Sequence, residues 1–322
     1  MTINRRIENP CYDTISIYYR FDSEEEYQNY LSWIKTRLER SAFKKINDTN
    51  ALILIGWIKN IRVTVSRSGV TITGSLCKFF NGNNYYSMSR NQTMLCILSL
   101  QVALGLSLQN AIVRRIDFGC CLIMNAQPEN YFTGLGMCGK YESWQREHTL
   151  YYETGYKSLI FYNKNSEMMS HRYPIPPEEI YSNTLRYEIR LKRQINYQIN
   201  RGQVLVRHLY DLSFYNEMIM RWANEYELIH KNRTLQPLKN QLTAKDGIEY
   251  TLASLMILQG TNNVTRLISV VKDKFTQGSY ARYQKKLKSL KFLSKESELI
   301  TELSTKILQI TENALLIASD EE

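Results

Sequence analysis

Apolar and polar positions alternate along several segments in the first two thirds of the chain. A period of two is typical of a strand, because successive side chains of a strand point to opposite faces. Turn residues such as the Thr154-Gly155 pair separate some of these segments. We expect the segments to form a central antiparallel sheet. They are residues 11–20, 60–66, 70–80, 111–125, 148–153, 157–164 and 184–192.

Other segments repeat their apolar residues at helical spacing. Ser23, followed by three glutamates, predicts a helix to about residue 40, because such residues cap a helix and suit its positive amino-terminal end. Ser89 predicts a helix over 90–107 in the same way. A proline cluster predicts a surface loop over 165–183. Beyond residue 192 the predicted elements are helices, over 193–200, 211–230, 245–259, 263–275, 279–292 and 294–317.

Together these elements predict an α+β fold with a central antiparallel sheet, flanking helices and a helical C-terminal region. A chain of 322 residues suits one large domain or two moderate ones. The mixed pattern becomes purely helical near residues 231–240. We therefore expect a first domain over residues 1–231 and a second over 232–322.

The composition points to a polyanionic partner. The chain has 41 Lys and Arg against 31 Asp and Glu, a net charge of +10, and 23 tyrosines. Clustered cations bind phosphate backbones, and aromatic rings interleaved with them stack on the bases of single strands. The six cysteines show no zinc spacing and are expected to be reduced thiols. Without a secretion signal or membrane span, the chain is expected to be cytoplasmic.

Two carboxylates lie in the segments expected to form the middle of the sheet. Asp117 stands in an otherwise apolar run, where a carboxylate needs a cation as partner. Glu188 shares one face of its strand with three cations, Arg186, Arg190 and Lys192. On adjacent strands, the two carboxylates predict a Mg²⁺ or Mn²⁺ site. The alternatives are a salt bridge from Asp117 to a neighbouring arginine and a solvated charge ladder on an edge strand.

Two tyrosines are candidates for a nucleophile. Tyr162 lies two residues before Lys164, whose ammonium group would lower the cost of forming a phenolate. Tyr197 follows Glu188 by nine residues, on a segment that is expected to be helical. A tyrosine with a metal-bound phosphate can break a DNA phosphodiester through a covalent phosphotyrosine. The residues alone do not choose between the two.

Several motifs, in this order, resemble the filamentous-phage gene II/X family of phage and plasmid rolling-circle replication initiators. The resemblance spans roughly residues 60–230, and its first motif is Gly-Ser-Leu-Cys-Lys-Phe-Phe-Asn-Gly-Asn-Asn at 74–84. The other motifs are residues 115–119, 125–132, 148–152, 159–164, 185–192 and 211–215. The resemblance implies a nickase that cleaves one strand of a double-stranded origin, stays on the 5′ phosphate through tyrosine and later rejoins the ends.

The resemblance also suggests which residues act. Its nucleophilic position falls on Tyr162, although Ser158 replaces the family's threonine, whereas a related plasmid family would favour Tyr197. Asp117 and Glu188 carry over as metal ligands. The implied partners are origin DNA, the nicked strand, and a host helicase and polymerase. The residues assigned to DNA binding are Lys78, Asn83, Asn84, Arg115, Arg186, Arg190, Lys192 and, in a basic helix of the tail, Arg282, Lys285 and Lys286.

A second function class remains open at this point. A non-catalytic origin-binding protein or repressor would use the same basic surface, with its carboxylates engaged only in salt bridges. Asp117 in its apolar run favours the enzyme over this alternative, because a buried carboxylate is costly without a cation.

Overall fold

A computed structural model of the chain describes residues 9–45, 52–235 and 294–320, together with residues 251, 253–254, 276, 278–282 and 285. It divides into two compact units. The larger unit consists of Met1–Glu129, Met137–Ile229 and Thr305–Glu322. The smaller unit consists of Asn130–Gly136 and His230–Ser304. The separation of functions between residues 1–231 and 232–322 stays a prediction.

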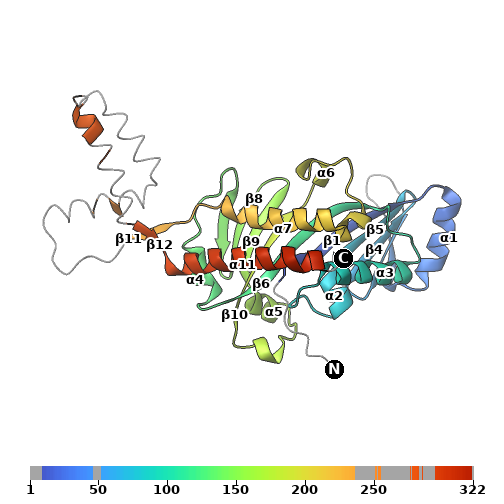
Figure 1. The fold of residues 1–322 in the computed structure, drawn as a ribbon. Coiled ribbons are helices and arrows are strands. Elements are labelled where there is room, and N and C mark those ends of the chain that lie inside the picture. Colours follow the sequence, from blue (N-terminus) through green and yellow to red (C-terminus); the bar gives the residue numbers. More distant parts are fainter. Residues whose placement is uncertain are drawn as a thin grey trace. The chain divides into compact units, whose positions relative to one another are not determined.

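The main sheet confirms the predicted α+β class. Its ten strands pair antiparallel in the order β2-β3-β4-β5-β1-β6-β10-β9-β8-β7 (Figure 1). The strands are β1 (Cys11–Arg20), β2 (Glu39–Lys45), β3 (Leu52–Ile58), β4 (Ile61–Ser66), β5 (Gly69–Ser75), β6 (Ile112–Met124), β7 (Glu142–Arg146), β8 (Thr149–Glu153), β9 (Lys157–Asn163) and β10 (Asn183–Leu191). A two-stranded sheet pairs β11 (Arg233–Leu235) with β12 (Ser294–Glu296).

Helices connect the strands and continue after the sheet. The described α-helices are α1 (Glu24–Lys35), α2 (Leu76–Asn81), α3 (Arg90–Leu104), α4 (Pro128–Phe132), α5 (Lys164–Ser170), α6 (Ile195–Gln198), α7 (Leu212–Glu227) and α11 (Glu298–Asp320). Short 3₁₀ helices cover Pro177–Glu179 and Val206–Tyr210. Among these described helices, none combines the length and the apolar character needed to cross a membrane.

One face of the central strands is aromatic and packs against α7. Trp222 of α7 donates its indole N–H to the Tyr187 carbonyl at 3.2 Å, and the Tyr187 hydroxyl donates to the Trp222 carbonyl at 3.0 Å. Tyr187 also stacks on Phe161 of β9, with ring centroids 4.4 Å apart. All three side chains are buried. Because these large rings fix β10 from one side, the opposite face of the strand is held in a defined position.

The predicted strands agree with the structure within one or two residues, with one exception. Residues 76–80, predicted to continue a strand, form α2. The Ser75 side chain accepts a hydrogen bond from the Lys78 N–H, and Gly82 ends the helix in the left-handed conformation at φ 80°. A serine cap and a left-handed glycine are the usual boundaries of a short helix. Residues 39–45, 52–58 and 142–146 form strands that the sequence pattern did not predict.

Three helix or loop predictions need correction. The helix predicted to residue 40 ends at Lys35, because β2 begins at Glu39 and pairs with β3. The loop predicted over 165–183 begins inside α5, which the Asn163 side chain caps by accepting from the Ser166 N–H. The helix predicted over 193–200 shrinks to α6, since Gln194 is left-handed at φ 50°. Most of the predicted helices over 245–259, 263–275 and 279–292 lie outside the described residues.

Candidate nucleic-acid site

Six charged side chains alternate in sign across the face of the sheet opposite α7. We call them the charge network: Asp13, Arg115, Asp117, Arg186, Glu188 and Arg190. They come from β1, β6 and β10, which are neighbours in the sheet although they are far apart in sequence. The strand register creates the cluster, because Arg190 lies opposite Asp117 and Glu188 lies opposite Gly119. Gly119 makes room there, since a Cβ atom would lie 2.6 Å from the Glu188 Cβ.

Arginine is the direct partner of each carboxylate in the network. Arg186 lies 3.4 Å from Asp13 and 3.2 Å from Glu188, measured between nitrogen and oxygen. Arg190 contacts Glu188 at 2.5 Å and Asp117 at 3.6 Å. Arg115 then binds Asp117 with two hydrogen bonds, of 2.8 and 2.7 Å. Such alternating pairs compensate the cost of burying each charge.

The network is closed at one end and open at the other. The side chains of Arg186 and Glu188 are only 1% and 2% exposed, whereas those of Arg190 and Arg115 are 30% and 35% exposed. At the closed end the Asn84 amide donates to Asp13 at 3.0 Å and its backbone carbonyl accepts from Arg186 at 3.3 Å. A DNA phosphate therefore has access to Arg115 and Arg190, while Arg186 is shielded.

Burial and the neighbouring arginines act in opposite directions on the carboxylates. Burial raises the pKa of Asp117 to about 6, even though Arg115 donates two hydrogen bonds to it. Burial alone would also raise the pKa of Glu188, but Arg190 and Arg186 hold that pKa below its ordinary value. The Arg186 guanidinium similarly keeps the pKa of the buried Asp13 below its ordinary value. Near neutral pH the network holds three negative and three positive charges.

The two carboxylates predicted to bind a metal do not form a ready metal site. Both accept hydrogen bonds from guanidinium groups, so an ion would have to displace these contacts. In the described part of the chain, no group of three His, Cys, Asp or Glu residues is arranged to hold a metal ion. Asp117 instead makes the salt bridge to Arg115 that the sequence left as an alternative. Glu188 is not on an edge strand, because β10 pairs with both β6 and β9.

Tyr162 lies at the closed end of the network, opposite Arg186 on the neighbouring strand. It is only 8% exposed, and burial raises its pKa well above the ordinary value. Lys164 is the first residue of α5, with its nitrogen 6.0 Å from the Tyr162 ring centre. That nitrogen donates instead to Asn84 at 2.9 Å and to Glu167 at 2.7 Å. The expected activation of Tyr162 by Lys164 has no direct contact to support it.

Tyr197 has the opposite surroundings. It lies on α6, just after β10, and is 83% exposed. Its neighbours Ile195 and Asn196 line a cavity of about 470 Å³. Three cations, Arg114, Lys192 and Arg193, line the same cavity. Cations gathered in a concave site attract phosphate, so the exposed tyrosine lies beside a surface suited to a DNA backbone.

The remaining predicted DNA-binding residues are scattered. Lys78 lies over the Tyr173 ring at 4.1 Å, and the Asn83 side chain accepts from the Tyr85 N–H at 3.0 Å. Arg282 and Lys285 belong to described helical residues of the tail, but Lys286 lies outside the described residues. The structure therefore brings only part of the predicted set together. That part is Arg115, Arg186 and Arg190 in the network and Lys192 in the cavity.

Asp13 is the member of the network that the sequence analysis missed. It is 6% exposed and lies in the apolar strand β1, so it carries the same signal that singled out Asp117. Its partner Arg186 is 173 positions away in the sequence. A rule that marks every carboxylate inside an apolar strand would have found Asp13, but the sequence spacing does not reveal its partner.

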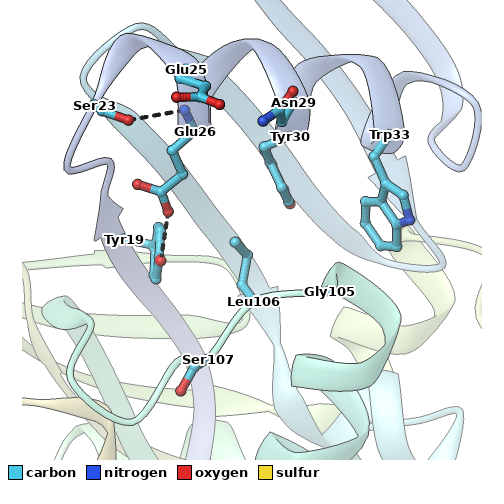
Figure 2. A pocket seen from close by; sticks show the side chains of 10 residues that line it. All are labelled: Tyr19, Ser23, Glu25, Glu26, Asn29, Tyr30, Trp33, Gly105, Leu106 and Ser107. Carbon is cyan, nitrogen blue, oxygen red and sulfur yellow. Dashed lines mark hydrogen bonds between the residues drawn. The ribbon is translucent and has the colours of Figure 1, made fainter.

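A second cavity, of about 630 Å³, lies between α1 and the residues that follow α3. Figure 2 shows Glu26 reaching from α1 toward Tyr19, whose hydroxyl donates to it at 2.8 Å. Glu25 also lines this cavity, together with Tyr30 and Trp33. Two carboxylates repel phosphate, so this cavity does not belong to the nucleic-acid site.

Comparison with known proteins agrees with the resemblance seen in the motifs. Residues 45–227, more than half of the chain, match the family Phage_CRI, described as the N-terminal part of a phage replication-associated protein. The match covers β6, β9, β10 and α6, and so includes five of the six network residues and both candidate tyrosines. A search of curated proteins found no match. The chain belongs to this phage family of rolling-circle replication initiators.

Proposed function

We propose that the protein nicks one strand of its replication origin with Tyr197 as the nucleophile. One observation carries this choice: Tyr197 is 83% exposed beside a cavity lined by three cations, whereas Tyr162 is 8% exposed. A scissile phosphate is part of a large polymer, so the attacking hydroxyl must be reachable from outside. The raised pKa of Tyr162 also opposes formation of its phenolate.

The proposed step conserves the phosphodiester bond energy. The Tyr197 phenol loses its proton, its oxygen bonds to phosphorus, and the bond between phosphorus and the 3′ oxygen breaks. The released 3′ oxygen takes up a proton, which leaves a 3′ hydroxyl and a 5′ phosphotyrosine. The reverse attack rejoins the strand without a nucleotide cofactor. A host polymerase would extend the 3′ hydroxyl, and a host helicase would separate the strands.

Arginines at the open end of the network have a binding role in this proposal. Asp117 and Glu188 hold the guanidinium groups of Arg115 and Arg190, and both arginines remain about one third exposed. Guanidinium groups fixed in this way are suited to paired hydrogen bonds with phosphate. Arg114, Lys192 and Arg193 of the cavity would extend the contact along the backbone. Dependence of the reaction on Mg²⁺ or Mn²⁺ stays a prediction.

The test uses supercoiled DNA that carries the protein's own origin. Wild-type protein is expected to produce nicked circles with protein attached, in the presence of Mg²⁺ or Mn²⁺. Tyr197→Phe should abolish both the nick and the attachment, whereas Tyr162→Phe should keep them if the protein folds normally. Loss of nicking in Tyr162→Phe alone, with an unchanged melting temperature, would assign the nucleophile to Tyr162.

The alternative of a non-catalytic origin-binding protein also has an observation in its favour. Each carboxylate of the network is paired with arginine, as a purely structural role requires. In that case wild-type protein would bind the origin and leave supercoiled DNA intact under every metal condition. Nicked circles in the same experiment would exclude the alternative.

A further inference from the structure

Two aromatic side chains form an exposed stack on the hairpin at the end of the sheet. Trp144 of β7 and Tyr151 of β8 are directly paired across the strands. Their ring centroids are 3.8 Å apart, with an interplanar angle of 12°. Trp144 is 36% exposed, and the Arg146 guanidinium lies 5.0 Å from its ring centre. We call Trp144, Tyr151 and Arg146 the aromatic clamp.

The clamp lies on the same face of the sheet as the charge network. Tyr151 pairs with Ile160, and Ile160 pairs with Glu188, so these residues form one row across three strands. Strands lie about 4.8 Å apart, which places the Tyr151 position about 10 Å from that of Glu188. Side chains of one row point to the same face. A polymer bound to the open end of the network therefore needs only a short extension to reach the clamp.

A chain of hydrogen bonds also joins the clamp to the cavity beside Tyr197. The Trp144 indole N–H donates to Glu153 at 3.3 Å, and the Lys192 ammonium donates to the other oxygen of Glu153 at 2.7 Å. Lys192 is one of the three cations that line the cavity. Clamp and cavity thus form one continuous surface, which carries aromatic rings at one end and cations at the other.

The position of Trp144 is unusual for a residue that only stabilises the sheet. β7 is the last strand of the main sheet, and all five of its residues are exposed. A cross-strand aromatic pair contributes roughly 0.2–1 kcal/mol to a sheet. That contribution does not require an indole and a guanidinium together at the surface. Exposed rings beside cations are the pattern that binds single-stranded nucleic acid.

We propose that the aromatic clamp binds single-stranded DNA next to the cleavage site, by stacking a base on the Trp144 and Tyr151 rings. The proposal rests on the proposed nicking function, because it takes the cavity beside Tyr197 as the cleavage site. A stacking base displaces the long Arg146 side chain from the indole, and the guanidinium then pairs with a phosphate. A duplex cannot use this surface, because the faces of its bases are already stacked on one another. The clamp therefore selects an opened strand.

The test compares single-stranded and duplex DNA in a binding assay that does not depend on cleavage. Labelled oligothymidylate and its duplex with oligoadenylate are titrated with Tyr197→Phe protein, and fluorescence anisotropy gives each Kd. Added to this background, Trp144→Ala should weaken single-strand binding by about 5- to 100-fold and duplex binding by less than about twofold. Trp144→Phe should restore most of the single-strand affinity, because a phenyl ring still stacks.

Trp33 provides a matched control. It also lies under an arginine, with the Arg37 guanidinium 4.0 Å from its ring centre, but it belongs to α1. Trp33→Ala should leave both Kd values within about twofold of the background protein. Unchanged single-strand affinity in Trp144→Ala, or an equal loss for both DNA forms, would overturn the clamp. Neither result bears on nicking, which the plasmid experiment with wild-type protein decides separately.

Discussion

Replacing Arg186 by methionine tests whether the charge network stabilises the fold. Arg186 is 1% exposed and is the partner of both Asp13 and Glu188. Methionine fills a similar volume with a flexible apolar chain, so the change removes the charge and leaves only a small cavity. Two buried carboxylates would then lose their shared cation at neutral pH.

The expected loss follows from the contacts that remain. Breaking a buried ion pair from one side costs about 3–5 kcal/mol, because an uncompensated charge stays behind. Glu188 keeps Arg190 at 2.5 Å, and Asp13 keeps the Asn84 amide at 3.0 Å. Neither carboxylate is left without a partner, so the two losses do not add in full. We therefore expect Arg186→Met to lower the free energy of unfolding by about 3–5 kcal/mol.

Urea unfolding followed by tryptophan fluorescence gives this free energy. Arg201→Met is the matched control, because Arg201 also lies 3.2 Å from a carboxylate, that of Glu217, while both side chains are about one third exposed. Such a pair contributes less than about 1 kcal/mol. Adding Glu188→Gln to Arg186→Met should recover part of the loss, because the buried negative charge is removed. Equal losses in Arg186→Met and Arg201→Met would refute the reasoning.

Three further predictions concern the same region. Burial raises the pKa of Asp117 to about 6, so the folded state binds this proton more tightly than the unfolded state does. Wild type should therefore lose about 3 kcal/mol of stability relative to Asp117→Asn as pH rises from about 4 to about 7, and a pH-independent difference in urea unfolding would contradict this. Gly119→Ala should cost about 3 kcal/mol in the same assay, because its Cβ would lie 2.2 Å from the Tyr187 carbonyl oxygen. Gly155→Ala should be nearly neutral, since no atom lies within 4 Å of its added Cβ, and equal effects of the two alanines would argue against crowding. Millimolar Mg²⁺ should leave the melting temperature of the free protein unchanged, because arginines engage the carboxylates, and should raise it once an origin oligonucleotide supplies phosphate oxygens; a rise without DNA would indicate a ready metal site.

The sequence predicted the central strands well because their patterns are local. Alternation along residues 111–125 and 184–192 identifies β6 and β10, and the single Asp117 marks the charged face. The fate of that charge could not be predicted, because it depends on the register between strands. Only pairing of Arg190 opposite Asp117 shows that arginine occupies the place expected for a metal.

Exposure was the second property that the sequence could not supply. Tyr162 and Tyr197 are the same residue type near similar cations, so the pattern treats them alike. The structure separates them because β9 lies inside the sheet, while α6 follows a left-handed Gln194 at the surface. The clamp was missed for a similar reason, since β7 is short and polar and its Trp144 has meaning only beside Tyr151.

The strand order has a consequence for how the protein folds. β2 to β5 and β7 to β9 pair with their neighbours along the chain, so each group can form from local contacts. β1, β6 and β10 join the two groups through pairings such as that of Asp13 with Arg186, which closes a loop of 173 positions. Distant pairings are slow, because the loop entropy must be lost before the contacts form. The charged side chains then stay hydrated until the rate-limiting step has passed, so substitutions among them should speed unfolding far more than they slow folding.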